Sequence, residues 1–135
     1  MPVVEEFFMT SKGKKILIAD DDSNLVDMIS DILQSHIDGI DIKTVNNGYE
    51  ALITAGNFIP DFLILDIRMP KINGLEVCRR LRSNENIPSH LKILAMTAHT
   101  ETYDRKTVLA AGADEYLFKP INMKTLLDTI DSFFL

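Results

Sequence analysis

The sequence contains little cysteine, glycine and proline, and it contains no tryptophan. Its 135 residues include one cysteine, six glycines and five prolines. A lone cysteine excludes a disulfide within the chain and a cysteine cluster for zinc or iron–sulfur, so we expect a reducing, cytoplasmic environment. With 46% hydrophobic and 25% charged residues, the composition also excludes a disordered or collagen-like chain and indicates a globular domain.

The chain also lacks an excess of positive charge and long hydrophobic runs. Fourteen Lys and Arg residues against 20 Asp and Glu residues give a formal net charge of −6, so there is no general basic surface for nucleic acid. No stretch approaches the roughly 20 apolar residues of a membrane span, and the N-terminus does not resemble a secretory leader. We therefore expect a protein or small-molecule partner, with no direct binding to nucleic acid or membrane.

Length and periodicity indicate one α/β domain, since a domain takes roughly 100–200 residues. Short apolar runs alternate five times with helical patterns, which is typical of βαβ units with a parallel sheet covered on both faces. The predicted strands are 15–19, 41–45, 62–65, 92–96 and 116–118. We place the domain at residues 14–135 and treat residues 1–13, which show no clear period, as an N-terminal arm.

Helical spacing between the predicted strands supports this doubly wound arrangement. The apolar stripe of the first helix consists of Leu25, Met28, Ile29, Ile32 and Leu33. Asp22 is of a type that caps the start of this helix. The fourth helix, over about 101–111, has the weakest pattern and ends at Gly112, and the last helix begins near Met123.

Polar residues stand where four of the apolar strands end. Asp20 and Asp21 follow the first strand, Asp66 the third, Thr97 the fourth and Lys119 the fifth. In an open α/β sheet the ligand crevice lies beyond the carboxyl ends of the strands. If the first and third strands are neighbours, the three aspartates converge, and a hard divalent cation would relieve their repulsion. Mg²⁺ is the expected ion.

This set of side chains suits phosphoryl transfer. Mg²⁺ is usually held by one or two protein carboxylates and keeps water and a phosphate oxygen as further ligands. A carboxylate can itself be the nucleophile and form an aspartyl phosphate. Asp66 is the candidate nucleophile, because the residues after it do not look helical, which argues against a capping role. Lys119 is the candidate ammonium that neutralises the transferred group.

Other signatures of chemistry are absent or have a structural explanation. The sequence has no dinucleotide, P-loop or zinc-protease motif. The histidines stand in unrelated segments and predict no metal cluster: His36, His90 and His99. Cys78 lies on the inward stripe of the third helix and is predicted to be a core residue. A small basic cluster is predicted to be a solvated helix face: Arg79, Arg80 and Arg82.

From about Lys14 to the C-terminus, the chain resembles the receiver domain of two-component response regulators. The matching segments are Ile-Leu-Ile-Ala-Asp20-Asp21-Asp22, Leu-Ile-Leu-Asp66-Ile-Arg-Met-Pro70-Lys-Ile-Asn-Gly74, Met-Thr97-Ala98 and Ala-Gly112-Ala-Asp-Glu-Tyr116-Leu-Phe-Lys119-Pro120. The resemblance implies a flavodoxin-like, doubly wound (βα)5 fold with strand order 2-1-3-4-5, in a stand-alone form like the chemotaxis regulators. It also implies a cis peptide bond before Pro120.

The resemblance implies a role for each residue of the predicted site. Asp66 accepts a phosphoryl group, in a Mg²⁺-dependent reaction, from a histidine kinase or a histidine phosphotransfer protein. The implied metal ligands are Asp20, acting through water, Asp21, Asp66 and the backbone carbonyl of Arg68. Thr97 binds the phosphoryl oxygens and Lys119 pairs with them.

Two further pairs of residues have roles by the same resemblance. Tyr116 is the aromatic switch residue, which turns inward as Thr97 moves. Arg68 and His99, each two residues past a key site, tune the lifetime of the phosphoryl group.

The implied activity is a switch and not turnover, with self-catalysed phosphoryl acceptance and slow autodephosphorylation only. The output face is the fourth helix, the fifth strand and the fifth helix, which bind a separate downstream protein. Only 135 − 120 = 15 residues follow Pro120, so we expect no attached output domain.

Two alternatives stay open. The first is an interaction module that no longer accepts phosphate. The second is a magnesium phosphohydrolase with an aspartate nucleophile, although Arg68 stands where such enzymes have a second acid.

Overall fold

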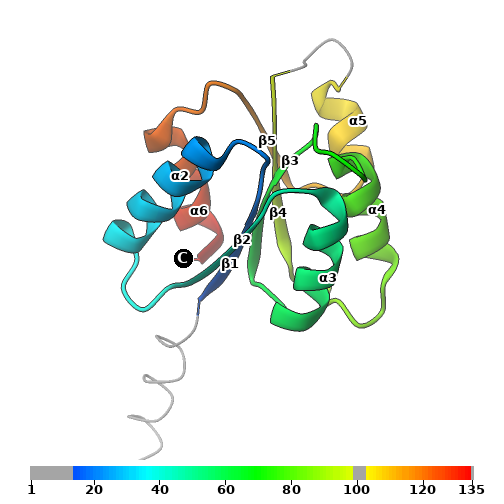
Figure 1. Ribbon diagram of the computed structural model, residues 1–135, viewed down its shortest axis with the longest axis horizontal. Helices are drawn as coiled ribbons and strands as arrows, with labels where there is room; N and C mark the ends of the chain where they lie inside the picture. The colour runs from blue at the N-terminus through cyan, green and yellow to red at the C-terminus, as the bar shows by residue number, and fades with distance from the viewer. Residues whose placement is uncertain (1–13, 99–102, 135) are drawn as a thin grey trace, which may run out of the picture.

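Five parallel strands form one sheet with helices on both faces (Figure 1). The computed structural model describes residues 14–98 and 103–134. The strands are β1 (Lys15–Ala19), β2 (Asp41–Val45), β3 (Phe62–Asp66), β4 (Lys92–Thr97) and β5 (Glu115–Phe118). The helices are α2 (Ser23–His36), α3 (Gly48–Phe58), α4 (Gly74–Ser83), α5 (Arg105–Ala110) and α6 (Met123–Phe134). The strand order is β2-β1-β3-β4-β5, which confirms the predicted doubly wound fold.

Alternate residues of the central strands enter two separate cores, because successive side chains of a strand point to opposite faces. One core lies against α2 and α6 and includes Ile16, Ile18 and Ile64. The other lies against α3, α4 and α5 and includes Leu17, Leu63 and Leu65. Cys78 is buried in the second core, as predicted, and burial raises the pKa of its thiol to about 12.

The stripe of the first helix that faces the sheet overlaps the predicted one and differs from it at Met28. α2 buries Val26, Ile29 and Leu33, whereas Met28 is 48% exposed. The prediction of Met28 as a core residue was therefore wrong. Val26 lies three residues before Ile29 and shares its face, while Met28 is rotated away by about 100° around the helix axis.

Aspartate caps fix where two of the helices begin. The Asp22 carboxylate accepts a hydrogen bond from the Leu25 N–H at 3.2 Å, as predicted. The fourth predicted helix starts later than expected, at Arg105. Its cap is Asp104, whose carboxylate accepts a hydrogen bond from the Thr107 N–H at 2.8 Å, and a capping residue does not itself have helical backbone angles.

The basic cluster of α4 divides into two parts. Arg79 and Arg80 are exposed and pair with Glu76 of their own helix, as expected of a solvated face. Arg82 does not belong to that face, and its prediction was wrong. Its guanidinium donates hydrogen bonds of 2.7–2.9 Å to the Leu91 carbonyl, the Gly112 carbonyl and the Asp114 carboxylate.

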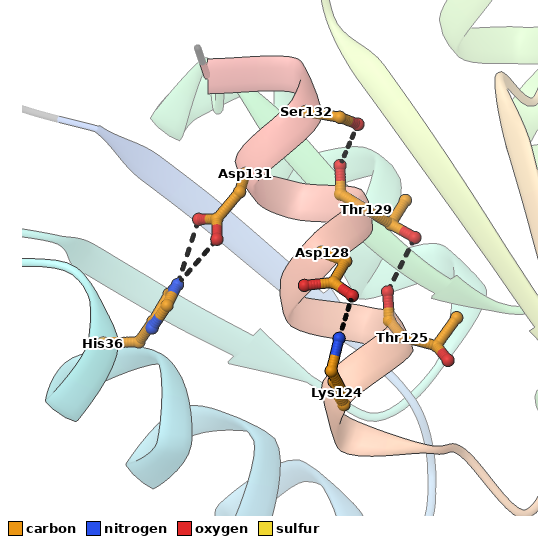
Figure 2. A network of polar contacts seen from close by, with 7 residues as sticks. All are labelled: His36, Lys124, Thr125, Asp128, Thr129, Asp131 and Ser132. Carbon is orange, nitrogen blue, oxygen red and sulfur yellow. Dashed lines mark hydrogen bonds and ion pairs between the residues drawn. The ribbon is translucent and has the colours of Figure 1, made fainter.

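A network of polar contacts covers one surface of α6 and reaches the end of α2 (Figure 2). His36 at the end of α2 contacts both carboxylate oxygens of Asp131 at 3.0 Å. Within α6, the Lys124 ammonium donates a hydrogen bond to Asp128 at 2.8 Å.

In residues 14–98 and 103–134, no helix combines the length and hydrophobicity that crossing a bilayer requires.

Candidate functional site

The predicted site residues lie together at the carboxyl end of the sheet. Asp66 ends β3 and Thr97 ends β4, while Asp20 directly follows β1. Ala19 pairs with Leu65, and Asp66 pairs with Met96, so parallel pairing brings these strand ends side by side. The exposed fractions are 1% for Asp20, 4% for Asp66 and 0% for Thr97.

Three carboxylates meet at this end of the sheet. Asp20, Asp21 and Asp66 each offer one carboxylate oxygen, and these oxygens lie within 4.8 Å of one another. Asp20 and Asp66 are buried, whereas Asp21 is exposed. Negative charges this close repel one another, and the repulsion is stronger for the two that water cannot screen.

The Lys119 ammonium bridges the two buried carboxylates. Its Nζ lies 2.7 Å from Asp20 Oδ2 and 3.2 Å from Asp66 Oδ2. Burial disfavours the charged ammonium, but its interactions with Asp20 and Asp66 outweigh that cost and raise the pKa of Lys119. The peptide bond between Lys119 and Pro120 is cis, as the resemblance implied.

The Asp66 carboxylate has a pKa well above that of an ordinary aspartate. Burial raises its pKa from 3.8 to about 6, and the Asp20 charge contributes in the same direction. Lys119 and a hydrogen bond from the Arg68 N–H, 3.2 Å from Asp66 Oδ1, oppose this rise. With a pKa of about 6, the carboxylate is ionised in most molecules at neutral pH and can act as a nucleophile.

Asp20 is the member of the cluster whose hydrogen bonding is incomplete. Its Oδ1 accepts a hydrogen bond from the Asp22 N–H at 2.9 Å. Its buried Oδ2 has an ionic contact with Lys119, yet no donor in the described part of the chain meets it with hydrogen-bond geometry. Such a buried oxygen in an acidic cluster fits a hard divalent cation such as Mg²⁺.

Two glycines allow the loop between β3 and α4 to pack closely around Asp66. A Cβ on Gly74 would lie 2.6 Å from the Asp66 carbonyl oxygen, and a Cβ on Gly48 would lie 1.9 Å from the Ile72 carbonyl oxygen. Neither distance is sterically possible, so any larger residue would displace the loop. The sequence predicted Gly74 only as part of the family segment and gave no sign of the role of Gly48, which depends on a contact between distant segments.

Tyr116 lies inward in this structure. It is buried, and its hydroxyl donates a hydrogen bond to the Tyr103 backbone carbonyl. Its ring also packs edge-on against Phe118 with 5.1 Å between ring centroids. The sequence predicted Tyr103 only as part of the weak helix over about 101–111, and it gave no sign of this contact with a residue of β5.

Of the two positions predicted to tune the lifetime of a phosphoryl group, only one lies in the described part of the chain. Arg68 is exposed, and it lines a pocket of about 380 Å³ that shares Asp21 with the acid cluster. The other lining residues are Asp21, Met69, Pro70, Asn73 and Tyr103. His99 lies outside the described residues, as does the predicted arm over residues 1–13.

Comparison with known sequences relates this geometry to a family. The profile of the response regulator receiver domain matches residues 16–131. The DNA-binding response regulator MtrA of Mycobacterium tuberculosis is 35% identical over 119 residues, covering 88% of this chain and 50% of MtrA. The alkaline phosphatase synthesis transcriptional regulatory protein PhoP of Bacillus subtilis is 38% identical over 110 residues, covering 82% of this chain and 44% of PhoP. The chain thus spans about half the length of these curated relatives.

Solved structures similar to this chain include response regulators and receiver domains. Chemotaxis response regulator CheY4 of Vibrio cholerae matches with a TM-score of 0.80 and 31% identity, covering 90% of this chain and 99% of that one. The receiver domain of sensor histidine kinase PA1611 of Pseudomonas aeruginosa matches with a TM-score of 0.79 and 29% identity, covering 90% and 98%. That structure has a magnesium ion coordinated in its active-site cleft.

Proposed function

This chain belongs to the response regulator receiver domain family of two-component systems, and from that membership we propose that Asp66 is its phosphoacceptor. The observation that supports the proposal most directly is the environment of the Asp66 carboxylate. It is buried, mostly ionised at neutral pH, next to the Lys119 ammonium and within reach of two more carboxylates. A candidate nucleophile, a cation and a candidate metal site therefore lie together at the carboxyl end of the sheet.

The proposed reaction transfers a phosphoryl group from a phosphohistidine of a histidine kinase or a histidine phosphotransfer protein. An Asp66 carboxylate oxygen attacks phosphorus, the phosphorus–nitrogen bond of the donor breaks, and the leaving imidazole takes up a proton from solvent. The product is an acyl phosphate on Asp66. Lys119 stabilises the negative charge on the phosphoryl oxygens, and the Thr97 hydroxyl hydrogen-bonds one of them.

Mg²⁺ is the proposed cofactor, held by Asp20, Asp21, Asp66 and the Arg68 backbone carbonyl. When bound, the ion supplies positive charge to the oxygens of the transferred group. The protein supplies the burial and the fixed strand ends that keep the three carboxylates together. We propose Arg68 and His99 as the positions that set how long the phosphoryl group survives.

We propose that phosphorylation shifts an equilibrium between two conformations, in which Thr97 and Tyr116 move together. The proposed output face consists of α5, β5 and α6, which bind a downstream protein. Curated relatives are named as DNA-binding or transcriptional regulators and are matched over about half their length. We propose that any contact with DNA is made by another part or partner, since this chain has a net charge of −6.

The activity that we propose is self-catalysed acceptance of the phosphoryl group and its slow loss, without turnover of an external substrate. We place this activity in the cytoplasm, because the one cysteine is a free, buried thiol and no second cysteine exists to pair with it.

Mass spectrometry of the intact protein tests the proposal. Incubation with Mg²⁺ and phosphoramidate should add one phosphoryl group to the wild type and none to Asp66→Asn. Asp61→Asn is a matched control, because Asp61 precedes the other end of β3 and its carboxylate accepts the Lys15 N–H. Absence of an adduct on the wild type, or an undiminished adduct on Asp66→Asn, would refute the phosphoacceptor assignment.

A second measurement separates this proposal from an interaction module that no longer accepts phosphate. Beryllium fluoride mimics a phosphoryl group, and with Mg²⁺ it should shift the NMR resonances of Thr97 and Tyr116 in the wild type. A spectrum that does not respond would favour the interaction module.

A further inference from the structure

The pocket that shares Asp21 with the acid cluster is lined by different parts of the chain. One wall comes from the ends of β1 and β3 and from the loop before α4, and it includes Asp21 and Arg68. The lining residue that comes from elsewhere in the chain, within the described residues, is Tyr103, which precedes α5. Since Asp21 belongs to both the pocket and the acid cluster, a molecule that approaches the cluster from this side passes Tyr103.

Three contacts fix the position of Tyr103. Its backbone carbonyl accepts a hydrogen bond from the buried Tyr116 hydroxyl. Its side chain is partly buried and packs against the core that lies under α3, α4 and α5. Its neighbour Asp104 caps α5. These contacts hold Tyr103 in one position at the edge of the pocket.

We propose that Tyr103 is a positioning residue of the phosphoacceptor site, an inference that rests on the proposed function of Asp66. The Tyr103 ring limits the access of water and small phosphodonors to Asp66, and Tyr116 holds the ring in place through the Tyr103 carbonyl. In hydrolysis, a water oxygen attacks phosphorus, the bond from phosphorus to the Asp66 oxygen breaks, and the water proton passes to the departing inorganic phosphate or to solvent. A wall that excludes water slows this step.

The same wall affects formation of the acyl phosphate from a small donor. Phosphoramidate has to bring its phosphorus to Asp66 through the mouth of the site, and its phosphorus–nitrogen bond breaks as ammonia leaves with a proton from solvent. A wider mouth lowers the donor concentration at which the rate is half-maximal. Tyr103 therefore affects both the formation and the loss of the phosphoryl group without contacting the phosphorus.

The test compares Tyr103→Ala, Tyr103→Phe and the control Tyr49→Ala. Tyr49 is also a tyrosine near the start of a helix, it is 53% exposed, and it does not line the pocket. Intact-mass measurements follow adduct formation against phosphoramidate concentration and adduct loss after the donor is removed. We expect Tyr103→Ala to increase both rates several-fold and to lower the half-saturating donor concentration. Tyr103→Phe keeps the ring and the carbonyl and should match the wild type.

The outcomes distinguish this inference from the proposed function. A wild-type adduct with unchanged rates in Tyr103→Ala refutes the role of Tyr103 and leaves Asp66 as phosphoacceptor. An equal rate increase in Tyr49→Ala also refutes it, since the effect would not be specific to the pocket. If Tyr103→Ala does not fold, Tyr103→Leu decides, because it keeps an apolar side chain against the core but removes the ring, and it should increase both rates to a smaller degree. A wild type without any adduct refutes the proposed function and this inference together.

Discussion

The two ends of the sheet differ in how many carboxylates lie beside each cation. At the amino end, Asp114 Oδ2 accepts hydrogen bonds from the Arg82 guanidinium and from the Ile93 N–H, both at 2.8 Å. At the carboxyl end, Asp20, Asp21 and Asp66 lie together, and Lys119 is the described cation that pairs with the two buried ones. The amino end has enough donors for its charge and the carboxyl end does not. This difference separates an ion pair that stabilises the fold from a cluster of acids that could hold a metal ion.

The largest expected effect concerns the amino end. Arg82→Ala removes three hydrogen bonds and leaves Asp114 without its cation, which should lower the free energy of unfolding by about 2–4 kcal/mol. The measurement is urea denaturation followed by circular dichroism. Arg80→Ala is the matched control on the same helix, because its exposed pair with Glu76 should contribute less than about 0.5 kcal/mol. Equal losses in the two variants would contradict the structural role of Arg82.

Arg82 also shows where sequence reasoning stops. Two exposed arginines, Arg79 and Arg80, stand just before it in the sequence, whereas the groups that it binds in Gly112 and Asp114 lie 30 and 32 residues away. No local pattern reports such a contact. Two other contacts could not be predicted for the same reason. They are the hydrogen bond from the Tyr116 hydroxyl to the Tyr103 carbonyl and the close approach of Gly48 to Ile72.

The polar residues of the candidate site were easier to predict. Asp66, Thr97 and Lys119 each come at or directly after the end of an apolar strand, and parallel strands place their carboxyl ends at one edge of the sheet. All five strands could be predicted to within one residue, and for β1, β3 and β4 the reason is related, since buried strands are continuous apolar runs. The face of α2 could be predicted only in part: Ile29 and Leu33 are buried as predicted, but Met28 and Val26 are both apolar and only packing decides which one is buried.

The second largest effect concerns the packing of the carboxyl end. Gly74→Ala places a Cβ against the Asp66 backbone, so the loop has to move, at a cost of about 1–3 kcal/mol. The displaced Asp66 should also accept phosphate more slowly in the mass-spectrometric assay. Gly56→Ala is the control, because a Cβ there has no neighbour within 4 Å and alanine favours a helix by about 0.5–1 kcal/mol. If Gly74→Ala keeps wild-type stability and phosphorylation, the close approach has no functional importance.

The third effect tests the electrostatics of the carboxyl end without metal. Burial raises the pKa of Asp66 from 3.8 to about 6, so the folded protein binds a proton more tightly than the unfolded chain. Between about pH 4 and pH 6 the wild type should therefore lose stability as pH rises, and the loss should be complete above pH 6. Asp66→Asn lacks this titration.

The observable for this third effect is the difference in unfolding free energy between wild type and Asp66→Asn, measured in EDTA across that range. It should shift in favour of the variant by roughly 1–2 kcal/mol, after allowance for partial solvent screening. A difference that stays constant from pH 4 to pH 7 would show that folding does not raise the pKa of Asp66. The ionised carboxylate would then not destabilise the carboxyl end, and the two ends of the sheet would not differ in this respect.

The smallest effect is the response of the carboxyl end to its proposed cofactor. A ligand that binds only the folded state at ten times its Kd stabilises that state by about 1.4 kcal/mol, so Mg²⁺ should raise the melting temperature of the wild type by a few degrees. Asp21→Asn should abolish this rise without loss of basal stability, because Asp21 is exposed and its charge only adds to the repulsion. Asp38→Asn, an exposed residue outside the cluster, should keep the full response at matched ionic strength. If Mg²⁺ has the same effect on Asp21→Asn as on wild type, the ion binds elsewhere, and the surplus of carboxylates at this end needs another explanation than a metal.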